Sequence, residues 1–522
     1  RLGFITEFML RDLLAHNAGQ HSIDLSTIVA DTEALSMVPE DFCRRYHILP
    51  VSYDVSAQLM LVAMVEMFNV IALDQLRALL GNDVEIETVL ASEMQLEEHL
   101  DKFYGYELSV DGILREIETG ELDYQSLTVH AYTQPVVRLV DALLMDAVKR
   151  GASDIHFEPE SAFLRIRYRV DGVLQQIRSL HKTYWPSVAV RLKVISGMDI
   201  AETRAPQDGR LNLNLCGRPI DFRASTHPTL HGENIVFRVL DREKAITPLE
   251  HMGLPAPTLA TLKLMLQRPE GILIVTGPTG SGKTTTLYSL LSSLNSEAVN
   301  IMTLEDPVEY PVNMMRQTSV FEVSKIDFAN GIRSIMRQDP DIILVGEVRD
   351  EDTANMAFRA AMTGHQVFTT LHTNSALGAI PRLLDIGISP EVMAGNIIGV
   401  IAQRLLRVLC PHCKEAVDAS AEECKTLGVT HGEATPIFKS KACLECGFTG
   451  YKGRMAIMEL LAVDSAMDAL IARRAHLDEL LALALQSGLL TLADAGISRV
   501  LAGDTSLEEL MRVVDLRVRF SA

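Results

Sequence analysis

The segment GPTGSGKT at 277–284 has the residue types and spacing of a loop that holds a polyphosphate. The apolar run GILIVT precedes it and TTTLYSLLSSL follows it, which predicts a loop between a buried strand and a helix N-terminus. In such a loop the glycines let backbone N–H groups point at phosphate oxygens, the Lys283 ammonium reaches the β- and γ-phosphates, and the Thr284 hydroxyl binds Mg²⁺. The predicted nucleotide-contacting residues are Gly277, Pro278, Thr279, Gly280, Ser281, Gly282, Lys283, Thr284 and Thr285.

Carboxylates stand where two further predicted strands end. The run IILV at 342–345 leads into Gly346 and Glu347, whereas many P-loop proteins place a metal-binding Asp at this strand end. TLEDPVEY at 303–310 supplies Glu305 and more acids directly after another strand. Because open α/β sheets bind ligands at the carboxyl ends of their strands, we predict that these acids lie at the nucleotide site and help with the metal or the water. The alternative is that they cap a helix or face solvent.

Two histidines flank a further short strand. TGHQVFTTLHTN at 363–374 carries His365 at one end of the strand and His372 at the other. Their spacing is not that of a metal-binding pair, which favours a sensor of the γ-phosphate. A hydrogen-bonded structural histidine is the alternative for each.

Four of the seven cysteines form two CxxC pairs, with 29 residues between the pairs. Two such pairs provide four thiolates in a tetrahedral arrangement with no open position, which predicts structural Zn²⁺ at Cys410, Cys413, Cys443 and Cys446. Four thiolates also suit iron, but no feature of the sequence indicates electron transfer. The odd total and the paired motifs favour reduced thiols, and hence the cytoplasm, over a disulfide framework.

The composition is that of a soluble multidomain protein. The chain has 522 residues, of which 48% are hydrophobic and 22% charged, and ordinary domain sizes predict three or four folded units. A net charge of −20 argues against loose, charge-driven binding to DNA or anionic lipid. The apolar window at 60–74 is shorter than a membrane span and is interrupted by Glu66 and Asn69. Membrane association is therefore expected through a partner, peripherally at the inner membrane.

Two kinds of pattern predict the elements that position these residues. The helical periodicity at 135–150 is followed by LRIRYRVDGVLQQIRSL at 164–180, which predicts a hairpin that turns at Asp171 and Gly172 and has one wet basic face. From Gly271 onward, four continuous apolar runs alternate with helical segments. Such runs are typical of parallel strands covered on both faces, so the core is expected to be an α/β nucleotide-binding fold.

Taken together, these motifs resemble the assembly ATPases of type II secretion and type IV pilus systems. The resemblance spans about 150–455 and implies a homo-hexameric ring that hydrolyses ATP with Mg²⁺ and drives pilin or pseudopilin assembly through an inner-membrane platform protein. The cysteine module, which retraction motors of the wider family lack, favours an extension or secretion motor. The matching stretches are RGASDIHFEP at 150–159, RAPQDGR at 204–210, HPTLHGENIVFRVLD at 227–241, GPTGSGKT, TLEDPVEY, RQDPDIILVGEVRD at 337–350, TGHQVFTTLHTN, CPHC and CLECGFTGYKGR.

The resemblance also implies a catalytic set. In this set two glutamates act on the attacking water and Mg²⁺, two histidines sense the γ-phosphate, and one lysine and two arginines contact the phosphates; the residues are Glu305, Glu347, His365, His372, Lys283, Arg223 and Arg238. Arg223 and Arg238 would approach from a PAS-like domain, and both lie on strand-like segments. A guanidinium suits the spread charge of a phosphoryl group, whereas a solvated sheet face is the alternative for each. Further family arginines are matched by Arg333, Arg337, Arg349 and Arg454.

The expected fold class is α/β and multidomain, with a PAS-like α+β domain before a RecA-like P-loop core. The expected parts are an amino-terminal docking or regulatory domain at 1–130, the PAS-like domain at 131–250, the RecA-like ATPase core at 251–409, a tetracysteine zinc module at 410–455 and a helical region at 456–522. In some relatives the amino-terminal module binds cyclic di-GMP through duplicated RLG segments. Here one copy, Arg1 to Gly3, is present and an upstream copy is expected to be missing, so a docking domain is favoured and cyclic di-GMP stays an alternative.

Two other function classes stay open on the sequence. A nucleic-acid translocase also uses RecA-like hexamers, but the net charge of −20 and the lack of an aromatic-basic stretch count against a nucleic-acid partner. A nucleotide-gated signalling scaffold would bind nucleotide without turnover. The sequence does not separate type II secretion from type IV pilus assembly, although VPEDFCRRYHILPV at 38–51 leans toward the pilus branch by resemblance.

Overall fold

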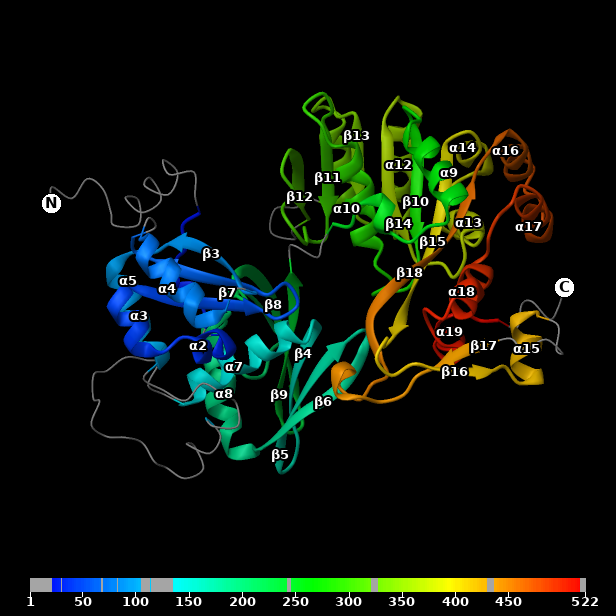
Figure 1. Ribbon diagram of the computed structural model, residues 1–522. Helices are drawn as coiled ribbons and strands as arrows, with labels where there is room; N and C mark the ends of the chain where they lie inside the picture. Colours follow the sequence, from blue (N-terminus) through cyan, green and yellow to red (C-terminus); the bar gives the residue numbers. More distant parts are fainter. Residues whose placement is uncertain are drawn as a thin grey trace. The chain divides into compact units, whose positions relative to one another are not determined.

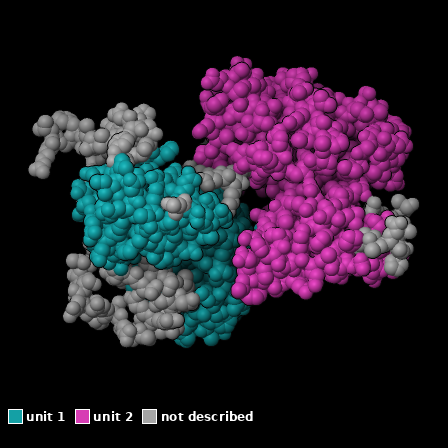
Figure 2. All heavy atoms as spheres, in the orientation of Figure 1, with its two compact units in different colours: residues 1–242 teal, residues 243–522 magenta. Residues whose placement is uncertain are grey.

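The chain folds into two compact units, residues 1–242 and residues 243–522 (Figures 1 and 2). The structure is a computed structural model, and the residues it describes are 21–29, 31–66, 69–81, 83–104, 113, 135–241, 246–320, 327–429 and 436–516. The predicted α/β multidomain class is confirmed, whereas the finer five-part division stays a prediction. The RLG segment at Arg1 to Gly3 lies outside the described residues.

The first unit begins with a small three-stranded sheet of order β1-β2-β3. Its strands are β1 (Ile48–Asp54), β2 (Leu59–Met64) and β3 (Glu85–Leu90), and its helices are α2 (Thr32–Met37), α3 (Glu40–Tyr46), α4 (Val70–Leu80) and α5 (Glu93–Tyr104). This part is tied to the rest of the unit by an ion pair of 2.7 Å between Lys149 and the buried carboxylate of Asp31.

A six-stranded antiparallel sheet forms the rest of the first unit, in the order β6-β5-β4-β9-β8-β7 (Figure 1). Its strands are β4 (Ala152–Pro159), β5 (Phe163–Val170), β6 (Val173–His181), β7 (Gln207–Leu215), β8 (Arg218–Thr229) and β9 (Gly232–Asp241). The apolar side chains of these strands form one core with helices α7 (Pro135–Lys149) and α8 (Trp185–Ile195). The alternation along each strand therefore leaves a polar face on the other side of the sheet.

The predicted hairpin of β5 and β6 is confirmed, and Asp171 and Gly172 turn the chain with φ angles of 48° and 82°. The wet basic face predicted for this hairpin is partly exposed, with the Arg165 and Arg167 side chains 32% and 29% exposed, but both arginines are also paired with carboxylates. Arg165 pairs with Glu160 at 2.8 Å and Arg167 pairs with Glu158 at 2.5 Å, so carboxylates of neighbouring residues on β4 and its turn neutralise these arginines.

The second unit is built on a seven-stranded sheet of order β12-β11-β13-β14-β10-β15-β18. The strands are β10 (Gly271–Thr276), β11 (Ile301–Glu305), β12 (Met315–Ser319), β13 (Ile342–Val345), β14 (Gln366–Leu371), β15 (Ile397–Leu409) and β18 (Tyr451–Ala462). All neighbours pair in parallel except β15 and β18, which pair antiparallel. Strands β10, β13 and β14 are buried throughout, as the continuous apolar runs predict.

Helices cover both faces of this sheet, so its core divides into two apolar clusters. The helices of the sheet region are α9 (Ala256–Leu266), α10 (Lys283–Leu294), α11 (Phe328–Ile335), α12 (Glu351–Met362), α13 (Ala379–Ile386) and α14 (Pro390–Met393). The C-terminal part adds β16 (Glu415–Asp418), α15 (Ala421–Leu427), β17 (Pro436–Lys439), α16 (Ser465–Ala472), α17 (Leu477–Gln486), α18 (Leu492–Leu501) and α19 (Leu507–Val513). In the described parts of the chain, no helix combines the length and apolar character needed to span a bilayer.

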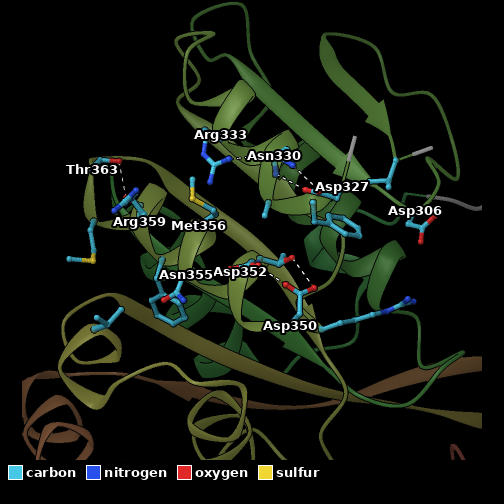
Figure 3. A pocket seen from close by; sticks show the side chains of 18 residues that line it. Asp306, Asp327, Asn330, Arg333, Asp350, Asp352, Asn355, Met356, Arg359 and Thr363 are labelled. Atoms are coloured by element: carbon cyan, nitrogen blue, oxygen red, sulfur yellow. Dashed lines mark hydrogen bonds between the residues drawn. The ribbon is translucent and has the colours of Figure 1, made fainter. Parts of the chain in front are cut away.

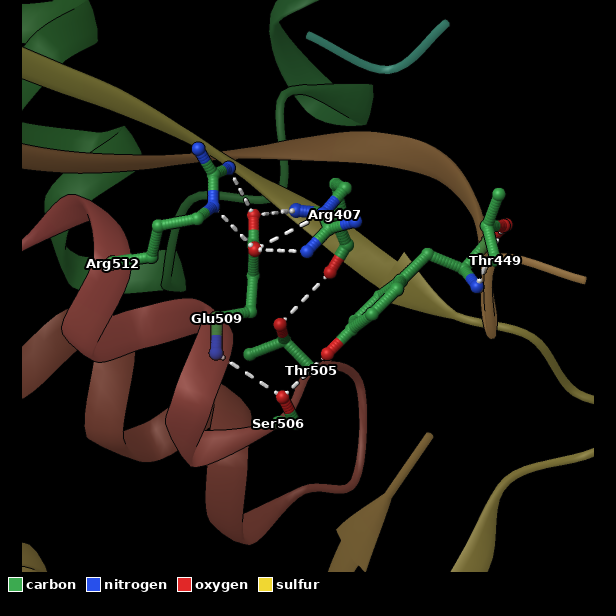
Figure 4. A network of polar contacts seen from close by, with 7 residues as sticks. Arg407, Thr449, Thr505, Ser506, Glu509 and Arg512 are labelled. Carbon is green, nitrogen blue, oxygen red and sulfur yellow. Dashed lines mark hydrogen bonds and ion pairs between the residues drawn. The ribbon is translucent and has the colours of Figure 1, made fainter. Parts of the chain in front are cut away.

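A buried carboxylate joins the C-terminal helix α19 to the sheet (Figure 4). Glu509 is fully buried and accepts hydrogen bonds from Arg407 of β15 at 2.8 Å and from Arg512 at 2.6 Å. The Arg407 guanidinium also lies 4.0 Å from the centre of the Tyr451 ring at the start of β18. Burial works to raise the pKa of Glu509, but the hydrogen bonds from Arg512 and Arg407 outweigh it, and the pKa lies below its ordinary value.

Glu509→Gln is therefore expected to destabilise the second unit by about 3 kcal/mol at pH 7, because a buried ion pair loses one partner. A lowered folded-state pKa gives stability that is present above the ordinary glutamate pKa and is lost as the pH falls through the folded value. Urea unfolding at pH 7 and at pH 4 measures this, with Glu508→Gln, an exposed neighbour, as the control. Equal losses of stability on acidification in wild type and Glu509→Gln would contradict the assignment.

Candidate functional site

The phosphate loop connects β10 to α10, as its sequence predicts. Gly280 and Gly282 have φ angles of 78° and 86°, in the left-handed region that favours glycine. The Lys283 ammonium donates hydrogen bonds to the carbonyl oxygens of Gly277 at 2.8 Å and Pro278 at 3.1 Å. The lysine that should reach the phosphates is thus held inside its own loop.

Gln403 of β15 supports this loop, and sequence reasoning missed it. Its side-chain amide donates to the Ser281 carbonyl at 2.7 Å and accepts from the Thr286 hydroxyl at 2.6 Å, and both bonds are buried. A Cβ atom on Gly282 would lie 2.8 Å from the Gln403 amide nitrogen, and one on Gly277 would lie 2.6 Å from the Gln403 carbonyl oxygen. The loop glycines are therefore needed for close contact with β15 as well as for backbone conformation.

The parallel strands bring five predicted site residues to one cavity of about 160 Å³. Lys283, Thr284, Glu305, Glu347 and His372 line it, because β10, β11, β13 and β14 all end at this edge of the sheet. The cluster combines an ammonium, a hydroxyl and two carboxylates. These donors fit a nucleotide phosphate and Mg²⁺.

Glu305 is buried and its two carboxylate oxygens are both engaged. One oxygen accepts from the Tyr288 hydroxyl at 2.5 Å, and the other accepts from the Thr303 hydroxyl at 2.6 Å. Gln317 donates more weakly to the same carboxylate, at 3.4 Å. Burial raises the pKa of Glu305 even though these hydrogen bonds oppose the shift. No local sequence pattern singles out Tyr288, which lies on α10 and reaches Glu305 of β11 only in the folded unit.

Glu347 has a different environment, because it is only half-buried and faces basic groups. Arg349 lies 2.5 Å from one of its oxygens, and His372 Nε2 lies 3.8 Å from the other. Burial and the nearby Lys283 lower the pKa of His372, so its imidazole is neutral at pH 7. Burial also lowers the pKa of Lys283, whereas Glu347 works in the opposite direction.

The structure does not bring all predicted residues to this cavity. His365 lies before β14, at the opposite edge of the sheet, and its Nδ1 is 2.9 Å from the Ala360 carbonyl oxygen. Arg223 and Arg238 lie on β8 and β9 of the first unit. The roles of these three residues toward phosphate stay predictions.

A second cavity, of about 1100 Å³, lies between α11 and α12 (Figure 3). Arg333 and Arg349 line this cavity and not the smaller one, and Arg333 donates to Asn330 at 2.7 Å. Asp306 lines both cavities, so they meet at the acidic segment after β11. Arg454 lies on β18 opposite Arg407, in neither of these two cavities.

The four predicted cysteines come together where β15 ends and β18 begins. Their sulfur atoms all lie within 4.8 Å of one another, with Cys410–Cys443 and Cys413–Cys446 distances of 3.8 Å. Zn–S bonds of about 2.3 Å in a tetrahedron put the sulfur atoms about 3.8 Å apart, so the cluster has the size of a Zn²⁺ site. The Gly450 backbone N–H points at the Cys446 sulfur at 3.2 Å, as expected for a donor to a thiolate ligand.

The chain is similar to ATPases of secretion and pilus machines. The family model described as Type II/IV secretion system protein matches residues 130–512, and the MshEN domain model matches residues 18–110. Type II secretion system protein E of Pseudomonas aeruginosa is 45% identical over 379 residues, covering 73% of this chain and 75% of that protein. Type IV pilus assembly ATPase PilB of Myxococcus xanthus is 37% identical over 525 residues, covering 98% and 92%. The solved structure of the pilus retraction motor PilT with bound ADP gives a TM-score of 0.50 at 28% identity, covering 71% of this chain and 95% of that chain.

Gln403→Leu is expected to weaken nucleotide binding about tenfold, because the buried Ser281 carbonyl and Thr286 hydroxyl would lose their shared partner, at a combined cost to the binding-competent loop on the order of 1.4 kcal/mol. Titration with a fluorescent ATP analogue measures the dissociation constant. Gln267→Leu, at an exposed glutamine of the same unit, is the control. An unchanged dissociation constant in Gln403→Leu would show that the loop keeps its shape without this side chain.

Proposed function

Because the chain belongs to the type II/IV secretion system protein family, we propose that it is a hexameric motor that drives pilin or pseudopilin assembly through an inner-membrane platform protein. It is an ATPase, as the family and its relatives indicate. The observation that carries the proposal is the convergence of Lys283, Thr284, Glu305 and Glu347 on one cavity at the carboxyl edge of a parallel sheet. The relatives include a type II secretion protein and a type IV pilus assembly ATPase, which supports the coupling to secretion or pilus assembly.

We propose separate roles for the two glutamates. Bound ATP with Mg²⁺ supplies the phosphoanhydride bond whose hydrolysis releases free energy. Glu347 lines the cavity, and the basic group nearest to its second oxygen, His372, is 3.8 Å away, so we assign it the proton of the attacking water. Glu305 is held by Tyr288 and Thr303, so it would present its carboxylate to Mg²⁺ or a Mg²⁺-bound water from a fixed position. Lys283 exchanges two loop carbonyls for phosphate oxygens.

Neutral His372 lies beside Glu347 and Lys283, where it can bond a phosphate oxygen without adding charge to the cavity. Arg223 and Arg238 of the first unit are proposed to approach the phosphates. ATP hydrolysis would then remove a phosphate contact of the first unit and allow it to move relative to the ATPase unit. His365 is proposed as a second γ-phosphate sensor on the resemblance alone, because its place before β14 puts it at the edge of the sheet opposite the cavity. This motion of the first unit is proposed to drive the platform protein from the cytoplasmic side of the inner membrane.

The cysteine cluster is proposed to hold structural Zn²⁺. The support is the set of sulfur distances and the absence of any non-cysteine ligand in the group formed by Cys410, Cys413, Cys443 and Cys446 among the described residues. A closed four-thiolate site contributes folding free energy and no chemistry of its own. For the amino-terminal part, the MshEN match at 18–110 keeps cyclic di-GMP as a candidate ligand beside the docking role.

Lys283→Ala is expected to lower the rate of phosphate release from ATP by at least 100-fold, because the ammonium that contacts the phosphates is lost. The matched control is Lys263→Ala, at an exposed lysine paired with Glu250 in the same unit. Equal rates in wild type and Lys283→Ala would refute the assigned site. Turnover that needs DNA and falls steeply with salt would favour a translocase, and no turnover even with the platform protein would favour a scaffold.

Purified protein is expected to contain one zinc ion per chain by elemental analysis. Cys446→Ser is expected to lower this content and the thermal midpoint of the second unit, because a three-thiolate site binds the metal more weakly. Cys216→Ser, at a cysteine of the first unit, is the control. Full zinc content in Cys446→Ser, or iron in place of zinc, would contradict the assignment.

A further inference from the structure

A row of arginines crosses the polar face of the six-stranded sheet in the first unit. The register places Arg210 of β7 opposite Arg223 of β8, and Arg223 opposite Arg238 of β9. Directly opposed residues of antiparallel strands share one face, and neighbouring strands lie about 4.8 Å apart. The three side chains therefore leave the backbone from positions that together span about 10 Å.

Asp154 of β4 continues this row. It is paired with Arg238 on one side and with Arg169 of β5 on the other. Its carboxylate oxygens lie 3.3 Å from Arg238 Nε and 3.5 Å from Arg169 Nε. Charge-assisted hydrogen bonds are usually about 2.7–2.9 Å long, so Asp154 holds both arginines loosely.

The row places three arginines on one face beside a single carboxylate, Asp154. Like charges that face each other across strands destabilise a sheet. Arg210 is exposed, and its guanidinium has no hydrogen-bond or ion-pair partner among the described residues. The Arg238 side chain is 57% exposed despite its contact with Asp154. Arginines elsewhere on this face, such as Arg165, have carboxylate partners at shorter distance.

We propose that Arg210 joins Arg223 and Arg238 in one phosphate-binding row, and that Asp154 is the resident counter-ion which Arg238 leaves when a nucleotide phosphate binds. This inference rests on the proposed function, because it takes the phosphates of ATP as the anion that meets Arg223 and Arg238. Phosphate oxygens accept the planar, multiple hydrogen bonds that guanidinium groups donate, and one triphosphate can contact several arginines of the row. Asp154 competes with phosphate for Arg238, and it also repels the anion.

Opposite effects of two substitutions test the proposal on the full chain. Arg210→Ala is expected to raise the KM for ATP, and the dissociation constant of a non-hydrolysed ATP analogue, at least threefold. Asp154→Asn is expected to lower both constants at least threefold, since the competitor and the repulsion are removed. Arg210→Lys should recover part of the loss. Arg165→Ala, on the same face but outside the row, should stay within twofold of wild type.

Three outcomes would overturn the inference, and they separate it from the proposed function. Unchanged constants in Arg210→Ala, together with raised constants in Arg223→Ala and Arg238→Ala, would remove Arg210 from the site and leave the proposed function standing. Unchanged constants in all three arginine variants, with turnover still lost in Lys283→Ala, would show that ATP does not meet this sheet. A raised KM in Asp154→Asn with an unchanged thermal midpoint would show that Asp154 supports binding and does not compete. If Asp154→Asn does not fold, the Arg210→Ala result decides alone.

Discussion

The parallel pairing of β10, β11, β13 and β14 is the constraint on which the rest of the second unit depends. Because these strands run in one direction, their carboxyl ends meet at one edge, and the phosphate loop, both glutamates and His372 come from those ends. A parallel sheet must be covered on both faces, which explains why β10 and β14 are buried throughout and why the exposed polar residues of the site follow the strands. The position of the chemistry thus follows from the direction of the strands.

Two cations that we propose as phosphate ligands have partners inside the chain that a ligand could replace. Lys283 donates to carbonyl oxygens of its own loop, and Arg238 contacts Asp154 at a distance longer than that of a strong charge-assisted bond. Such partners keep a cation from being left unpaired, yet they bind it less strongly than a phosphate would. Glu305 is the contrast, because short hydrogen bonds from Tyr288 and Thr303 hold it in one position.

Strand β15 links three features that look independent in the sequence. It carries Gln403 beside the phosphate loop and Arg407 in the network with Glu509, and Cys410 follows directly after its last residue. From Gln403 to Cys410 a strand extends over about 23 Å. Antiparallel pairing with β18 stiffens this span, so the loop support, the C-terminal helix and the cysteine cluster are held in fixed relation within the second unit.

The sequence by itself determined the elements whose signal is local. The spacing of 277–284 requires a phosphate loop, continuous apolar runs require buried strands, and two CxxC pairs require a four-thiolate cluster, because each depends on residues close along the chain. The tertiary structure alone decided which distant residues meet: Gln403 contacts Ser281 across 122 positions, and Arg210 joins a row only through strand register. It also separated His365 from His372, since the two ends of one strand lie on opposite edges of a sheet. Strand order and register set these contacts, and neither is written in the local periodicity of a chain.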